Sequence, residues 1–144
     1  MGELIDKLKA GYAAYDAGDE PRFRALVAAL MADDCETRGP QYEAHSREEV
    51  VAFWLAFRAA FPDGRHEWLS AVEHDGGAAF ELRYTGTHAG PLPGPDGEIP
   101  ATGRTVDLRI AQFVDTEGGR VVRWREYMDS AELMAQLGLV PSAA

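Results

Sequence analysis

The stretch that decides the fold runs from residue 84 to residue 139. It reads Y-T-G-T-H-A-G-P-L at 84–92, P-A-T-G-R at 100–104 and R-E-Y-M-D-S-A-E-L-M-A-Q-L-G-L at 125–139, with two strand-like runs before the last segment. A lone histidine, His88, ends one strand-like run, and a lone aspartate, Asp129, stands where the last run turns into a short helix. Ionisable groups at strand ends, beside apolar and aromatic side chains, suit a chain that lines a pocket.

Around this stretch the apolar residues recur with a period of two, which is typical of strands. The pattern predicts strands over 66–74, 78–88, 105–114 and 120–128, joined by glycine turns at 75–77 and 117–119, and a closing helix over 130–138. The segment 89–103 holds four prolines and four glycines, so we expect a long loop without regular structure. A connection of this length often forms the rim or lid of a site.

The first part of the chain has a helical period instead. Apolar residues at helical spacing predict helices over 3–16, over about 20–31 and from 47 to 61, and the third begins with a capping box formed by Ser46 and Glu49. An irregular or strand-like link is expected over 33–39. Helices followed by a meandering sheet indicate an α+β domain, with the helices packed on one face of a curved antiparallel sheet.

Length and charge restrict the possible functions. The 144 residues predict one domain over 1–144, large enough to bury a core without disulfides or a structural metal. With 24 acidic against 14 basic residues the net charge is −10, which argues against nucleic acid and against an anionic membrane surface as partners. The N-terminus does not read as a signal peptide and no run approaches the ~20 apolar residues of a membrane helix, so we expect a cytoplasmic protein.

The arrangement of residues 84–139 resembles the SnoaL-like polyketide cyclases and their ester-cyclase relatives, within the nuclear-transport-factor-2-like superfamily. The string Gly86-Thr87-His88-x-Gly90 carries the resemblance, together with Asp129 ahead of a helix that ends in Gln136-Leu137-Gly138. The resemblance implies a cone-shaped α+β fold around a pocket, a small apolar ligand, and a homodimer that pairs the outer, charged face of the sheet. It is more specific for the fold than for the reaction, because this fold carries many activities.

Two interpretations of Asp129 stay open. Asp129 precedes Ser130 and Glu132, so it suits the N-cap of the last helix. If the carboxylate instead faces an apolar cavity, desolvation raises its pKa and makes it a proton shuttle near neutral pH, which is the acid–base role that the resemblance implies.

His88 also has two interpretations. It shares strand parity with Phe80, Leu82 and Tyr84, so it points toward their apolar surroundings. There it either binds or protonates a substrate oxygen, or bonds to the neighbouring loop backbone and orders the Pro/Gly segment.

Aromatic residues supply the candidate ligand contacts. Trp54, Phe57 and Tyr84 lie at helical or strand spacing that suits either a cavity wall or plain core, and Arg109 and Tyr127 are further ligand-binding candidates on the last two strands. One departure from the family pattern is Arg125, which stands where a Trp is common. Trp124 has the parity opposite to that of Asp129, so either a β-bulge re-phases the strand or the pocket is more polar than that of the family, which would disfavour an aromatic polyketide as substrate.

The remaining chemistry-bearing residues give weaker signals. Asp107, Arg109 and Asp129 are similar to the water-activating set of limonene-epoxide-hydrolase-like proteins, although paired charges on strands more often bridge each other. No ligand spacing for a metal is present. Three histidines read as surface residues (His45, His66 and His74), and Cys35 as an inert buried thiol.

Three functional hypotheses follow. The favoured one is a SnoaL-like cyclase or isomerase without cofactor or metal, in which Asp129 removes a proton alpha to a carbonyl and His88 stabilises the enolate. The alternatives are hydrolysis by an activated water, as in epoxide hydrolases, and a non-catalytic dimeric module that binds a small molecule.

Overall fold

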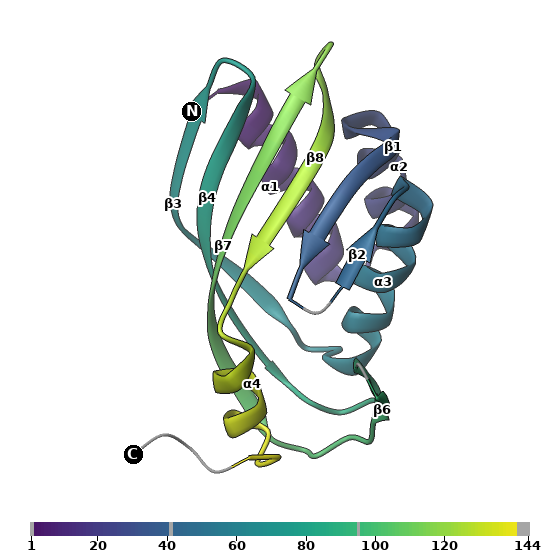
Figure 1. Ribbon diagram of the computed structural model, residues 1–144, viewed down its shortest axis with the longest axis vertical. Coiled ribbons are helices and arrows are strands. Elements are labelled where there is room, and N and C mark those ends of the chain that lie inside the picture. The colour runs from purple at the N-terminus through teal and green to yellow at the C-terminus, as the bar shows by residue number, and fades with distance from the viewer. Residues whose placement is uncertain (1, 41, 95, 141–144) are drawn as a thin grey trace.

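The computed structural model describes residues 2–40, 42–94 and 96–140. The three long helices lie in the first half of the chain, and strands dominate the second half (Figure 1). The elements are α1 (Glu3–Ala17), α2 (Glu20–Leu30), β1 (Met31–Gly39), β2 (Tyr42–Ala44), α3 (Arg47–Ala60), β3 (Arg65–His74), β4 (Gly77–Thr87), β5 (Leu92–Gly94), β6 (Gly97–Ile99), β7 (Thr105–Glu117), β8 (Arg120–Tyr127) and α4 (Ser130–Gln136).

The main sheet has six strands in the order β2-β1-β8-β7-β4-β3. Every neighbouring pair is antiparallel except β1 and β8, which run parallel, so the predicted antiparallel sheet is in fact mixed. The difference arises at 33–39, where the expected link is part of β1. This strand starts directly after α2 and enters the sheet beside β8, with Met31 and Cys35 fully buried.

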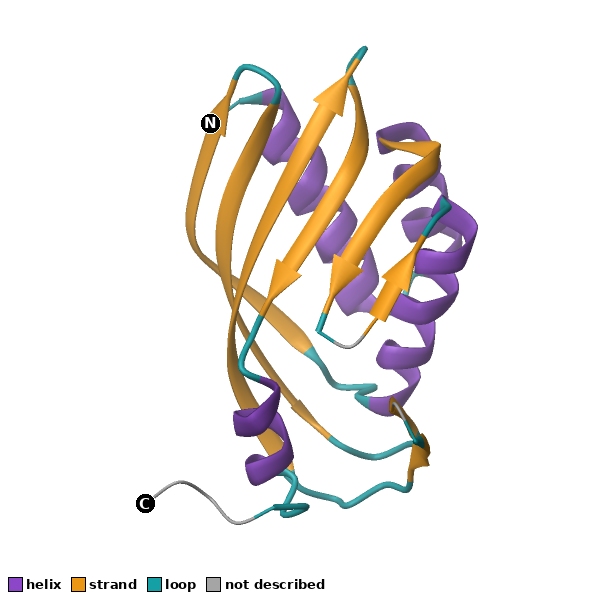
Figure 2. Cartoon of the chain, viewed as in Figure 1, coloured by secondary structure: helices purple, strands orange, loops and turns teal. Residues whose placement is uncertain are grey.

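The three long helices cover one face of the sheet (Figure 2). We call this covered, concave side the inner face and the opposite side the outer face. Side chains from α1 and α3, including Ile5, Leu8 and Val50, are buried against apolar residues of the strands. α4 lies at one end of the sheet, where it contacts β7. The predicted α+β architecture is confirmed.

Local sequence signals set the ends of the helices. The backbone N–H of Glu49 donates to Ser46 Oγ at 3.1 Å, so the predicted cap of α3 is confirmed. Asp19 caps α2 by accepting from the Arg22 N–H. α1 stops at Gly18, whose φ of 72° lies in the left-handed region that glycine enters without a steric penalty.

The segment 89–103 is more regular than its composition predicts. β5 and β6 form a separate two-stranded ribbon in which Leu92 pairs with Ile99 and Pro93 with Glu98. Proline is tolerated here because each strand of an isolated pair needs partners on only one side. The expectation of a wholly irregular loop is therefore wrong for these residues.

A β-bulge in β8 re-phases the strand. Asp115 pairs with Arg123 but its neighbour Thr116 pairs with Val121, which leaves Val122 as the extra residue. Val121 and Trp124 are consequently both buried on the inner face. This bulge lies before Trp124, and the pairing from Arg123 to Tyr127 is regular. It therefore does not bring Trp124 to the Asp129 side of the strand, and the predicted re-phasing is wrong at this position.

Candidate functional site

A cavity of about 200 Å³ lies between the helices and the inner face of the sheet. Its wall is mostly apolar, with aromatic side chains from α1, α3 and β8 and aliphatic ones from α2 and β7. Residues of the β5–β6 ribbon and of α4 line it as well, so the segment 89–103 forms part of the site's border, as predicted.

One carboxyl group lies in this apolar wall, that of Glu126 on β8. Burial raises the pKa of Glu126 from its ordinary value of 4.5 to about 7, although a hydrogen bond from Tyr42 partly opposes the rise. The Tyr42 hydroxyl donates to Glu126 Oε1 at 3.3 Å, and the Tyr42 ring stacks on Phe53 at 4.0 Å. A carboxyl group with this pKa exchanges protons readily near neutral pH.

Gln112 is the cross-strand neighbour of Glu126 on β7 and is almost fully buried. Trp124 Nε1 lies 3.1 Å from Gln112 Oε1, and because an indole nitrogen can only donate, this contact fixes which end of the amide is the oxygen. The Tyr12 hydroxyl donates to the same oxygen. With Oε1 held by two donors, the amide NH₂ remains as a hydrogen-bond donor on the cavity wall.

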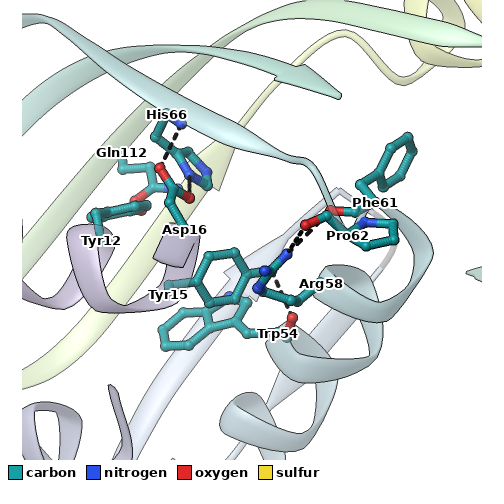
Figure 3. A network of polar contacts seen from close by, with 9 residues as sticks. All are labelled: Tyr12, Tyr15, Asp16, Trp54, Arg58, Phe61, Pro62, His66 and Gln112. Atoms are coloured by element: carbon teal, nitrogen blue, oxygen red, sulfur yellow. Dashed lines mark hydrogen bonds and ion pairs between the residues drawn. The ribbon is translucent and has the colours of Figure 1, made fainter. Parts of the chain in front are cut away.

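A second group of polar contacts ties α1 to α3 and β3 (Figure 3). The Tyr15 hydroxyl donates to the Trp54 carbonyl at 2.7 Å, and Arg58 donates to the carbonyl of Pro62 at 2.6 Å. His66 at the start of β3 is held by Asp16, with Nδ1 at 2.8 Å from Oδ1. The prediction that His66 lies on the surface is wrong, since its side chain is 9% exposed and lines the cavity. His45 and His74 are exposed, as predicted.

The predicted ligand contacts divide between the two faces of the sheet. Trp54 and Phe57 line the cavity. Tyr84 is buried beside the Phe57 and His66 rings and does not line the cavity, which corresponds to the plain-core interpretation of this residue. Arg109 and Tyr127 are exposed on the outer face.

Asp129 caps α4. Its Oδ1 accepts the Glu132 N–H at 3.1 Å, and its side chain is exposed and outside the cavity wall. The cap interpretation of Asp129 is confirmed. The structure does not bring Asp129 and His88 together in the cavity, so their acid–base roles remain a prediction from the sequence resemblance.

His88 is fully buried and does not line the cavity, and its ring stacks on that of Phe61 with the centroids 5.4 Å apart. Its Nδ1 accepts the Thr102 N–H at 3.2 Å, and its backbone N–H donates to the Arg104 carbonyl. His88 therefore fastens the far end of the 89–103 segment to the end of β4. This corresponds to the structural interpretation of the residue.

The charged residues of the outer face bridge one another. Arg83 forms a bidentate pair with Asp107 at 2.7–2.9 Å, so Asp107 does not face the cavity. The expected Asp107, Arg109 and Asp129 set for water activation is thus not assembled in the cavity. Cys35 is buried, and burial raises the pKa of its thiol to about 11, in agreement with the predicted inert role.

The part of the chain that the structure describes contains no group of three or more His, Cys, Asp or Glu side chains placed to hold a metal ion. None of the described helices is long and apolar enough to cross a membrane.

Comparison with known protein families identifies the chain. The sequence model of the SnoaL-like polyketide cyclases matches residues 8–137, which include most of α1 and every element from α2 to α4. The chain belongs to the SnoaL-like polyketide cyclase family. No curated protein sequence matches it.

Solved structures agree with this SnoaL-like fold. A candidate SnoaL-like polyketide cyclase from Jannaschia sp. CCS1 superposes with a TM-score of 0.82 at 17% identity, over 96% of this chain and 93% of that one. IdmH, a candidate polyketide cyclase from Streptomyces antibioticus, gives 0.75 at 25% identity, over 95% and 99%. AclR, a candidate hydroxylase from Streptomyces galilaeus, gives 0.79 at 21% identity, over 99% and 85%. Because cyclase and hydroxylase names occur on one fold, this SnoaL-like architecture alone does not determine the reaction.

Sequence reasoning missed the polar residues at the centre of this SnoaL-like cavity: Tyr12, Tyr42, Gln112 and Glu126. A usable signal was present in β8. Alternation from Trp124 puts Glu126 and Met128 on the Trp124 side of the strand, and once Trp124 is placed inside, Glu126 must follow. The bulge at Val122 concealed this, since it breaks the parity inherited from the start of the strand.

Proposed function

We propose that this chain is a cofactor-independent cyclase or isomerase that moves a proton on a small, apolar carbonyl compound, with Glu126 as the acid–base group. One observation carries the proposal: among the described residues, the partly buried Glu126 alone brings a carboxyl group to the mostly apolar cavity wall, where desolvation raises its pKa. A buried carboxyl with no cationic partner destabilises a fold, so its retention in the cavity wall favours a chemical role.

The geometry supports an enolisation. The Glu126 carboxylate removes a proton from the carbon alpha to the substrate carbonyl. The Gln112 amide N–H donates to the oxygen on which negative charge develops, and its fixed orientation means that little reorganisation is needed during the reaction. The proton is then returned by Glu126, either to another carbon in an isomerisation or to the alkoxide formed when the enolate attacks a second carbonyl in a ring closure.

This assignment replaces the acid–base pair expected from the resemblance. Asp129 caps a helix, and His88 bonds to Thr102 through Nδ1 while its buried Nε2 has no partner among the described residues. Neither side chain lines the cavity, whereas Glu126 does and accepts only the 3.3 Å bond from Tyr42 among the described residues. Variants of Asp129 and Glu126 therefore separate the two assignments.

The test follows deuterium exchange at the alpha carbon of 2-tetralone, a two-ring ketone, by NMR in D₂O. This readout needs enolisation only, so it does not require the natural substrate. We expect Glu126→Gln to lower the enzyme-catalysed exchange rate by about 10²- to 10⁴-fold, as is usual for the loss of a proton-transfer group. Asp129→Asn is the matched carboxyl-to-amide control and should exchange at the wild-type rate. Wild-type exchange in Glu126→Gln would refute the assignment, and 2-tetralone binding without catalysed exchange would favour a non-catalytic binding module.

We also propose a cytoplasmic homodimer that pairs outer faces. Phe113 and Tyr127 are 37% and 55% exposed there and pack edge to face, while Arg125 lies over the Phe113 ring. A second copy would cover these rings. Light scattering at micromolar concentration should give twice the chain mass, and a monomer mass would contradict the pairing.

A further inference from the structure

Asp16, in the last turn of α1, holds His66 by two contacts (Figure 3). Its Oδ2 accepts the His66 backbone N–H at 2.7 Å, and its Oδ1 lies 2.8 Å from His66 Nδ1. Both side chains are largely buried, at 19% and 9% exposure. Because the same carboxyl group contacts both the backbone and the ring of His66, it fixes the position and the orientation of the imidazole.

This contact also determines the tautomer. A carboxylate oxygen accepts hydrogen bonds, so Nδ1 carries the proton that points to Asp16. Nε2 is then the ring nitrogen left to bind a ligand, and in the neutral imidazole it is an acceptor. His66 lines the cavity, so this acceptor belongs to the same space as Glu126.

Aromatic rings surround the imidazole. The centroids of Tyr12 and Tyr84 lie 4.7 Å from that of His66, and the Tyr15 centroid lies at 5.8 Å. Their rings provide apolar walls, which strengthen any hydrogen bond made at Nε2 because water competes less there.

Tyr12 separates this group from the proposed base. Its ring contacts His66, while its hydroxyl bonds to Gln112, the cross-strand neighbour of Glu126. The cavity thus has two polar ends that belong to different strands, with apolar and aromatic surface between them.

We propose that His66 is a second substrate-binding residue, that its Nε2 accepts a hydrogen bond from a substrate hydroxyl, and that Asp16 is its positioning residue. This inference rests on the proposed function for the carbonyl end of the substrate, and it narrows the substrate class to hydroxylated carbonyl compounds of one or two rings. The size follows from the cavity of about 200 Å³, since an apolar cavity of roughly 150 Å³ accommodates benzene.

The test uses two probes of the same shape, 2-naphthol and naphthalene, which differ by one hydroxyl. Their dissociation constants are measured by fluorescence titration in the Glu126→Leu background, in which the side chain at position 126 has no atom that could accept the hydroxyl. Adding His66→Phe should weaken 2-naphthol about tenfold, the usual size of one good hydrogen bond, and change naphthalene less than about twofold. His74→Phe, an exposed histidine on the same strand, is the control and should change neither.

Several results would overturn the proposal. If His66→Phe weakened the binding of both probes equally, His66 would contribute only to the shape of the cavity. If it left the affinity for 2-naphthol unchanged, the hydroxyl would not bind to His66. Neither result affects the exchange assay with 2-tetralone. An error in the role assigned to His66 can therefore be distinguished from an error in the role assigned to Glu126.

A second measurement leaves His66 intact and so does not depend on how that variant folds. In ¹⁵N NMR of the unmodified chain, His66 should show a protonated Nδ1 and an unprotonated Nε2 whose resonance shifts when 2-naphthol is added. Asp16→Asn should disturb this tautomer and weaken 2-naphthol selectively. A His66 with Nε2 protonated, or one that does not respond to 2-naphthol, would contradict the inference.

Discussion

The two faces of the sheet shift the pKa of a carboxyl group in opposite directions. On the inner face, burial raises the pKa of Glu126 to about 7. On the outer face, hydrogen bonds from Arg123 and then Arg125 lower the pKa of Asp115 below its usual range, with both guanidinium groups at 2.8 Å. Glu126 directly follows Arg125 along β8, so adjacent positions of one strand have opposite environments.

The comparison shows that the face, rather than the residue type, determines what a carboxyl group can do here. A carboxylate paired with arginine stays charged and holds neighbouring strands together. A carboxyl in an apolar wall, with a tyrosine hydroxyl as its partner, is close to its midpoint at neutral pH and can donate or accept a proton. Glu126, on the inner face, therefore suits acid–base chemistry near neutral pH.

The largest expected effect is that of Glu126→Gln on the pH dependence of the unfolding free energy. Because the folded-state pKa of Glu126 is raised, its contribution to stability is greatest below the unfolded-state value and is lost as pH rises from about 4.5 to about 7. Over that window we expect Glu126→Gln to gain roughly 3 kcal/mol in unfolding free energy relative to wild type. Urea denaturation at pH 4.5 and pH 8 measures the difference in unfolding free energy between the variant and the wild type. If this difference were the same at both pH values, a raised pKa of the Glu126 carboxyl would be contradicted.

A smaller effect of opposite sign, a loss of unfolding free energy, is expected for Asp115→Asn. Its folded-state pKa is lowered, so its contribution is present above the unfolded-state value and is lost as pH falls through the folded-state value. Asp115→Asn should cost at most about 1 kcal/mol at pH 7, because the pairs are partly solvated. The cost should shrink below pH 4 and in high salt. Denaturation at pH 7 and pH 3 tests this, and a cost that grows in acid would rule it out.

The smallest effect is expected for Asp129. Asparagine caps helices about as well as aspartate, so Asp129→Asn should change the unfolding free energy by only a few tenths of a kcal/mol, whereas Asp129→Ala should cost about 1 kcal/mol. Thermal denaturation of the two variants provides the measurement. A marked stabilisation by Asn would instead indicate that the Asp129 carboxylate is desolvated in solution.

The sequence predicts most of the architecture because the signals for it are local. Helix caps such as Ser46 and the glycine turns at 75–77 and 117–119 act within a few residues, and the alternation along β4 and β7 is unbroken. Strand β1 was not recognised as a long strand because its pairing with β8 joins residues about 90 positions apart, and no local pattern encodes such a partner.

The site was less predictable for the same reason. Trp54 and Phe57 follow from the apolar stripe of one helix. Glu126 required knowledge of the bulge at Val122, and the inner position of His66 depends on Asp16, 50 residues earlier in the chain. Asp129 and His88 were selected by resemblance, and each has a local structural contact that the sequence also allowed.

The most direct test of the account is the pKa of the Glu126 carboxyl itself. A ¹³C NMR titration of the glutamate side chains, assigned by comparison with Glu126→Gln, follows each carboxyl separately. We expect one glutamate resonance that titrates near pH 7 and is absent from the spectrum of Glu126→Gln. If the Glu126 carboxyl instead titrates near its ordinary value of 4.5, the proposed acid–base role is contradicted.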